Sequence, residues 1–189
     1  MKRAATIWLR IRRREGGATL AEFAFTLPLL AAIVYAVFDF GGALVLKQKM
    51  EQAVYEAARL AASQSTDDFT SATVDTAGSI AVLRDSVARN LQAAGVNDCG
   101  LLGAASTSPG TAVWVYTVSG GGCPAPLVLT IRRQSVITVV GSGTVFFSRV
   151  TLQYPYQYHL GAILSVLTPG GTFQPSANLV VNASMKNLI

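Results

Sequence analysis

The fold is decided by the stretch RRREGGATLAEFAFTLPLLAAIVYAVFDFGGALVL, residues 12–46, where a basic run leads through two glycines into a long apolar segment. Residues 18–46 contain only two carboxylates, Glu22 and Asp39, and no basic side chain. A helix needs about 20 predominantly apolar residues to cross the ~30 Å hydrocarbon layer of a bilayer. The sequence therefore predicts one transmembrane helix over residues 18–46.

The positive charge of the chain lies before this segment. Residues 1–17 hold six basic side chains against Glu15 alone, which accounts for the whole formal net charge of +5, and the remainder of the chain is neutral. Basic residues beside an apolar span mark its cytoplasmic side. We therefore expect a cytoplasmic N-terminus, a C-terminal domain across the membrane, and no nucleic-acid partner, although a basic arm by itself is also compatible with phosphate binding.

The two glycines Gly16 and Gly17 precede the apolar segment, on its basic side. A secretory signal peptide instead has an apolar region of 7 to 15 residues followed by its small-residue cleavage site. Cleavage at Gly17 would remove a basic leader, residues 1–17, and leave the hydrophobic helix on the mature protein. Glycine suits a peptidase that approaches the backbone closely, because no Cβ obstructs it.

Glu22 needs an explanation, because an ionised carboxylate at the edge of a membrane is costly unless it is paired. Cleavage after Gly17 would create a mostly cationic α-amine on Ala18, which supplies one kind of partner. A local alternative is a capping box, in which Thr19 and Glu22 bond the backbone at a helix start.

Pro28 and Asp39 are the other unusual residues of the span. Pro28 predicts a kink, which either helps the chain leave the bilayer or is simply tolerated. Asp39 lies about 25 Å beyond Glu22 along a helix, so we expect it to mark the outer boundary of the membrane.

The helical pattern continues beyond the membrane over residues 47–62. Its apolar positions recur every three to four residues, at Leu46, Met50, Val54, Ala57 and Ala61. This stripe predicts an amphipathic extension packed against a domain or a neighbouring subunit. A continuous helix over residues 18–62 would be about 65 Å long, with Gly41-Gly42 as the expected place for a bend or break.

Three groups of residues carry a resemblance to a known family. They are EFAFTLPLL (22–30), FDFGG (38–42) and AVYEAARLAA (53–62). Together they resemble the N-terminal signature of TadE-like proteins, the pseudopilins or minor pilins of the tight adherence (Flp, type IVb) pilus. The closing segment FQPSANLVVNASMKN (173–187) is loosely similar to the end of that family, with Lys186 in place of the usual arginine.

The resemblance implies a function and a location. A prepilin peptidase would cleave between Gly17 and Ala18, and Glu22 would meet the N-terminal amine of a neighbouring subunit. The assembly helix would contain Glu22, Pro28 and Asp39. Its partners would be other pilins or pseudopilins and the pilus assembly machinery of the bacterial inner membrane, with the C-terminal domain in the periplasm or in an extracellular fibre used for adhesion. The alternative is an uncleaved signal-anchored envelope protein with a periplasmic binding or scaffold domain.

The rest of the chain predicts a periplasmic α+β domain over residues 74–189, after a polar linker at 63–73. Ile80, Leu83, Val87, Leu91 and Ala94 indicate an amphipathic helix that ends at Gly95. β-branched and aromatic runs at 112–118, 127–131, 135–140 and 145–154 predict an antiparallel sheet. With the long N-terminal helix this gives a type IV pilin-like fold.

Cys99 and Cys123 are the only cysteines. A domain outside the cytoplasm favours a disulfide between them, worth about 3 kcal/mol by loop closure. Free thiols or a metal site are the alternatives. The only histidine, His159, stands apart from any ligand motif, so we expect no metal and no cofactor.

Enzymatic function finds little support. His159 lies in an aromatic stretch, YPYQYH (154–159), and no nucleophile or phosphate-binding motif is present. The tyrosines of this stretch predict either a partner surface or an edge strand. An envelope enzyme is the least favoured of the three hypotheses, behind the pilin-like component and the signal-anchored protein.

Overall fold

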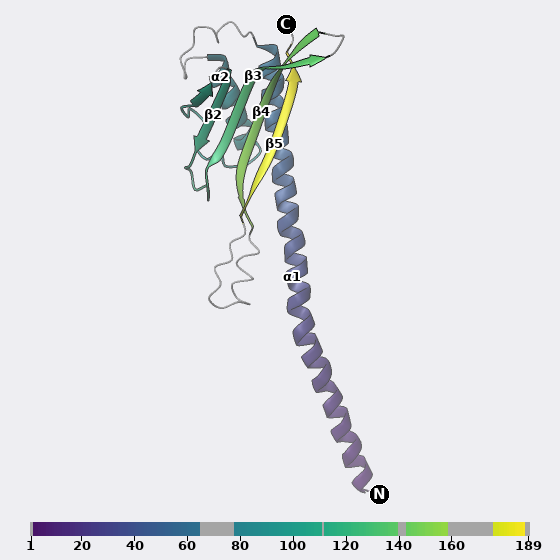
Figure 1. Cartoon of the computed structure of the whole chain (residues 1–189). Helices are drawn as coiled ribbons and strands as arrows, with labels where there is room; N and C mark the ends of the chain where they lie inside the picture. The colour runs from purple at the N-terminus through teal and green to yellow at the C-terminus, as the bar shows by residue number, and fades with distance from the viewer. Residues whose placement is uncertain (1, 65–77, 111, 140–142, 159–175, 188–189) are drawn as a thin grey trace. The chain divides into compact units, whose positions relative to one another are not determined.

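The computed structural model describes residues 2–64, 78–110, 112–139, 143–158 and 176–187. It forms two compact units. Among these residues, one unit contains 2–41 and the other contains those from 42 to 158 together with 176–187. The elements are two helices, α1 (Lys2–Ser63) and α2 (Gly78–Ala93), and five strands, β1 (Thr107–Gly110), β2 (Val113–Val118), β3 (Leu127–Val139), β4 (Gly143–Gln157) and β5 (Ser176–Lys186). The predicted α+β class is confirmed (Figure 1).

Helix α1 contributes to both units. Its assignment runs without interruption from Lys2 through Gly41 and Gly42 to Ser63, so the break that we expected at the two glycines is absent. Pro28 lies inside the helix. In the first unit the large apolar side chains of α1 are exposed, as for Phe25 at 82% and Phe38 at 76%. Such a surface is unusual for a helix in water and is typical of a helix that faces lipid.

The second unit is built around the predicted apolar stripe of α1. Met50, Val54, Ala57 and Ala61 are fully buried, and Leu46 packs at the edge of the same core. Helix α2 adds a second stripe, Ile80, Leu83, Val87 and Leu91, to that cluster. Both helical segments lie on one face of the sheet (Figure 1), and the buried strand residues of that face complete the core.

The sheet is an antiparallel meander with strand order β1-β2-β3-β4-β5. Burial alternates along β4: Val150, Leu152 and Tyr154 are buried, whereas Arg149 and Gln153 are exposed. The short edge strand β1 was not predicted, because TSPG has neither alternation nor strong β propensity.

Strand β3 joins two runs that the sequence analysis separated at 127–131 and 135–140. Arg132 pairs with Arg149 and Ser135 pairs with Phe147, so Arg133 and Gln134 together oppose the single residue Ser148. This is a β-bulge, and Gln134 adopts a φ of 59° to accommodate the extra residue. The polar residues at this point resemble a break between two strands in the sequence. The bulge accommodates them within one continuous strand.

Helix α2 ends as predicted. Gly95 has a φ of 71°, and the amide of Val96 donates to the carbonyl of Leu91 at 2.8 Å, which caps the helix C-terminus. The ammonium of Lys49 on α1 donates to the carbonyl of Ala94 at 2.7 Å. A cation at this end complements the helix dipole and ties the two helices together.

The tyrosine-rich end of β4 has one strand neighbour. Tyr154, Pro155 and Tyr156 pair with β5, whereas the register with β3 ends at Gln153. Pro155 is tolerated here because it has no backbone N–H to donate to a second neighbour. Tyr156 and Tyr158 make an edge-on contact with ring centroids 5.0 Å apart. The strand-edge interpretation therefore fits this end of β4.

Candidate functional site

The residues predicted for processing and assembly lie on one helix. Gly17, Ala18, Glu22, Pro28 and Asp39 all belong to α1. From Glu22 to Asp39 the separation along an α-helix is about 25 Å, so these carboxylates act as separate sites.

Gly17 is exposed, and a Cβ built on it would meet nothing within 4 Å. An alanine at this position is therefore sterically acceptable to the folded chain, and it would favour the helix by about 1 kcal/mol. The backbone at Gly17 and Ala18 is helical. A protease that binds extended backbone has to unwind this turn first, and the Gly16-Gly17 pair lowers the cost of doing so.

Glu22 is exposed and makes no ion pair with any residue in the described part of the chain. Its backbone carbonyl accepts a hydrogen bond from the Thr26 hydroxyl at 3.0 Å. Because α1 begins at Lys2, Thr19 does not stand at a helix start in the uncleaved chain. A capping box with Glu22 therefore requires a new N-terminus close to Ala18.

Pro28 and Asp39 differ in their surroundings. Pro28 removes one backbone donor inside α1, where Thr26 also turns its hydroxyl back to the carbonyls of Glu22 and Phe23. Asp39 is only 8% exposed, although its neighbours Phe38 and Phe40 are exposed. Aspartate is usually exposed and phenylalanine is usually buried, so the order here is reversed. A buried carboxylate is stable only when polar partners satisfy it.

By length and composition α1 holds one candidate membrane span, at Thr19–Ser63, with a mean hydropathy of 2.2 over its most apolar window. The exposed side chains of this span include Leu20, Phe23, Leu30, Ile33 and Val37. These observations support membrane anchoring through the N-terminal helix.

Cys99 and Cys123 form the predicted disulfide, with a Cα–Cα distance of 5.6 Å. It joins the loop after α2 to the turn between β2 and β3. Asn97 reinforces this junction: its amide nitrogen donates to the Gly121 carbonyl, and its side-chain oxygen accepts from the Cys99 amide at 2.9 Å. Both cysteines are consumed by the bridge, so neither is a free thiol or a metal ligand.

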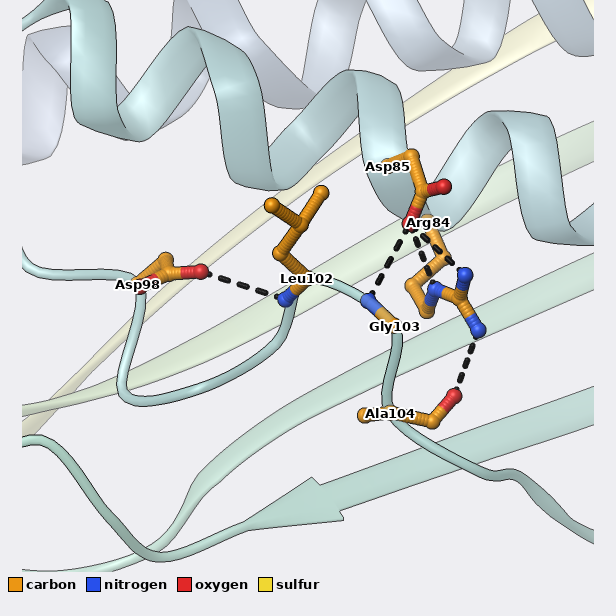
Figure 2. Close-up of polar contacts among 6 residues, drawn as sticks. All are labelled: Arg84, Asp85, Asp98, Leu102, Gly103 and Ala104. Carbon is orange, nitrogen blue, oxygen red and sulfur yellow. Dashed lines mark hydrogen bonds and ion pairs between the residues drawn. The ribbon is translucent and has the colours of Figure 1, made fainter.

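Arg84 and Asp85 of α2 contact the loop that follows this helix (Figure 2). The Arg84 guanidinium donates through Nη1 to the Ala104 carbonyl and pairs through Nη2 with Asp85 at 2.7 Å. It also lies 5.7 Å from the ring centroid of Tyr116. Asp85 in turn accepts from the Gly103 amide. This network could not be predicted from the sequence, because neighbouring residues of opposite charge on a helix give no periodic signal.

Tyr154 has a clearly shifted pKa. Burial raises the pKa of its phenol above the ordinary value near 10, and the negative charge of Asp98 raises it further. Asp98 also shapes the loop by accepting from the Leu102 amide at 3.1 Å (Figure 2). The effect on Tyr154 is structural, because its side chain faces the core.

The only histidine, His159, lies outside the described part of the chain. Within the described residues, no group of three or more His, Cys, Asp or Glu side chains is placed to hold a metal ion.

Comparison with known proteins bears on the helix that carries the candidate site. Residues 17–59 match the family model of TadE-like proteins. The match begins at the proposed scissile glycine and ends in the buried stripe of α1. No curated protein and no solved structure gives a significant match.

Proposed function

We propose that this chain, whose residues 17–59 are TadE-like, is a pseudopilin or minor pilin that supports initiation or assembly of a tight adherence pilus. The observation that carries the proposal is that the apolar segment of α1, residues 18–46, combines a lipid-type surface with one exposed carboxylate, Glu22, near its N-terminal end. The family is one of structural pilus components, which also argues against an enzyme.

In this proposal a prepilin peptidase cleaves after Gly17 and removes the basic leader, residues 1–17. The exposed position of Gly17 and the open space around it leave room for the enzyme to approach. Cleavage leaves a cationic amine on Ala18 at the start of the mature helix. The amine carries the charge that an unpaired Glu22 on a neighbouring subunit requires.

The proposed domain organisation follows from the same helix. Residues 18–46 span the inner membrane, residues 47–62 extend the helix into the periplasm, and after a linker at 63–73 the α+β domain (74–189) carries the disulfide and the sheet. A periplasmic location supports the disulfide, because bridges persist in oxidising compartments. Pro28 and Asp39 would then adjust how the helix leaves the bilayer and where it meets the aqueous phase.

The docking role is tested by Glu22→Gln, which keeps the shape and removes the charge. We expect normal leader removal and membrane insertion, with loss of crosslinking between this subunit and its neighbours in the assembling pilus. Glu51→Gln is the matched control, because Glu51 is an exposed carboxylate on the same helix outside the apolar segment. Unchanged crosslinking by the Glu22 variant would leave the carboxylate without a role in docking.

A signal-anchored envelope protein is the second candidate. It is favoured by the helical backbone at the proposed scissile bond, which a peptidase would have to unwind. In that case the leader stays attached and Glu22 has no amine to meet.

A further inference from the structure

Beyond Asp98 all the charged side chains of the chain are basic. The last acidic residue of the sequence is Asp98, and four basic residues follow it: Arg132, Arg133, Arg149 and Lys186. All four lie on β3, β4 and β5. The sheet is therefore purely cationic, although the chain beyond its leader is neutral as a whole.

Three of these cations share the face of the sheet that points away from the helices. Arg132 and Arg149 are direct cross-strand partners, and their neighbours Ile131 and Val150 are fully buried on the opposite face. Arg149 pairs in turn with Ser184 on β5, and Lys186 lies two residues further along on the same face. We call Arg132, Arg149 and Lys186 the basic row.

The basic row costs the fold stability. Like charges directly opposite each other in a sheet are destabilising, and the two arginines are separated by only about 5 Å at their Cα atoms. All three side chains are exposed, and none forms an ion pair with another described residue. Arg149 is oriented by the hydroxyl of Ser184, which accepts from its Nε at 2.9 Å. This leaves the terminal nitrogens of an ordered guanidinium for an external acceptor.

The row lies at the end of the second unit that is remote from Gly42. Arg133, next to Arg132, donates through Nη2 to the carbonyl of Gln64, just after the end of α1. Tyr156, near Gly42, is seven residues from Arg149 along β4, or roughly 23 Å. A lipid headgroup that contacts the chain at Gly42 is therefore too distant to reach the row.

The neighbouring side chains on this face disfavour a single-stranded nucleic acid. Such ligands need aromatic rings on which bases stack. Here the residues that pair beside the row are Thr130, Thr151 and Asn182, together with valines. Phe147 is half-buried and is the one aromatic side chain among the described residues of this face.

We propose that the basic row of the sheet docks an acidic segment of a partner protein. The arginine spacing of about 5 Å matches carboxylates three or four residues apart on a helix, whose Cβ atoms lie about 5–6 Å apart. Guanidinium forks favour carboxylates with this planar geometry. The inference concerns the sheet and does not depend on cleavage at Gly17 or on the role of Glu22.

The test uses the full chain in a neutral detergent and two fluorescent probes. One is a 16-residue helical peptide with glutamates four residues apart, and the other is a 16-nucleotide oligothymidylate. The variant is Arg132→Gln/Arg149→Gln. The control is Arg59→Gln/Arg89→Gln, which removes the same charge from exposed positions on α1 and α2. The basic leader binds anions equally in every variant, so only differences between variants are interpreted.

We expect the sheet variant to bind the acidic peptide about fivefold to tenfold more weakly than the wild type, with the control unchanged. We also expect its thermal unfolding temperature to be equal or higher, because a like-charge pair is removed. Equal peptide binding by the sheet variant and the control would overturn the proposal. So would a larger loss for oligothymidylate than for the peptide, because this result would assign the row to nucleic acid.

Discussion

The hydroxyl of Tyr156 lies 3.2 Å from the position that a Cβ on Gly42 would occupy. The tyrosine-rich end of β4 therefore approaches α1 closely at Gly42. The adjacent Gly41 has nothing within 4 Å of its own Cβ position, so the two glycines are not equivalent. Gly42 permits a close contact between helix and strand, and Gly41 does not take part in it.

We predict that Gly41→Ala is neutral or stabilising, because alanine favours a helix by up to about 1 kcal/mol over glycine. Gly42→Ala should gain roughly 0.5 kcal/mol less stability than Gly41→Ala, because its new methyl group displaces the Tyr156 hydroxyl. Thermal unfolding of both variants in detergent gives the comparison. Repeating it in a Tyr156→Phe background should remove the difference, and a difference of the same size without the hydroxyl would contradict the steric explanation.

We predict that the disulfide stabilises the second unit by about 3 kcal/mol, because it closes a loop with a sequence separation of 24 residues. The double variant Cys99→Ser/Cys123→Ser should therefore unfold at a lower urea concentration than the wild type. Mass spectrometry after alkylation under denaturing, non-reducing conditions is the accompanying check. Addition of two alkyl groups to the wild type would show that the bridge is absent from the protein in solution.

We predict that Arg84→Lys destabilises the protein by about 1 to 2 kcal/mol. Lysine keeps the charge, but it does not reach the Ala104 carbonyl, Asp85 and the Tyr116 ring together. Arg89→Lys is the control, because Arg89 is exposed on the same helix. Chemical denaturation measures both, and equal midpoints for the two variants would show that the network around the loop contributes nothing measurable.

We predict that stability falls in alkaline solution through Tyr154. The pKa of this phenol is raised in the folded state by burial and by Asp98, so the unfolded chain releases the proton first. The contribution to stability is complete below about pH 10 and is lost as the pH rises through the folded pKa.

Urea midpoints of the wild type and Tyr154→Phe, compared at about pH 8 and about pH 11, test this prediction. The variant should lose less stability over the interval. Tyr55→Phe serves as the control, because Tyr55 is 52% exposed on α1. An equal loss for all three proteins would show that Tyr154 does not cause the alkaline sensitivity.

The sequence predicted the helices better than the strands, for physical reasons. A stripe such as Met50, Val54 and Ala57 repeats at the helical period, and Gly95 marks a helix end by its freedom to adopt a positive φ. The bulge at Arg133 and Gln134 was hidden, because it depends on how β3 pairs with a distant strand rather than on local composition. The sequence likewise could not place Arg132 opposite Arg149, because that relationship depends on register.

The residues of the candidate site could be predicted where they follow one another along a single helix. Gly17, Glu22 and Pro28 were identified from their order along one helix, and the structure adds their exposure and surroundings. Burial of Asp39 was not foreseen, because a carboxylate near the end of an apolar segment is expected to face water. Its low exposure is a tertiary property that no local pattern encodes.

Cleavage after Gly17 is tested by the N-terminal sequence and intact mass of the protein, expressed with and without a prepilin peptidase. Gly17→Ala, whose methyl group meets open space in the folded chain, serves as a processing variant. We expect a new N-terminus at Ala18 in the wild type, only when the peptidase is present, and reduced processing of the variant. An intact N-terminal leader under both conditions would contradict this expectation and would leave a signal-anchored protein in which Glu22 has no amine to meet.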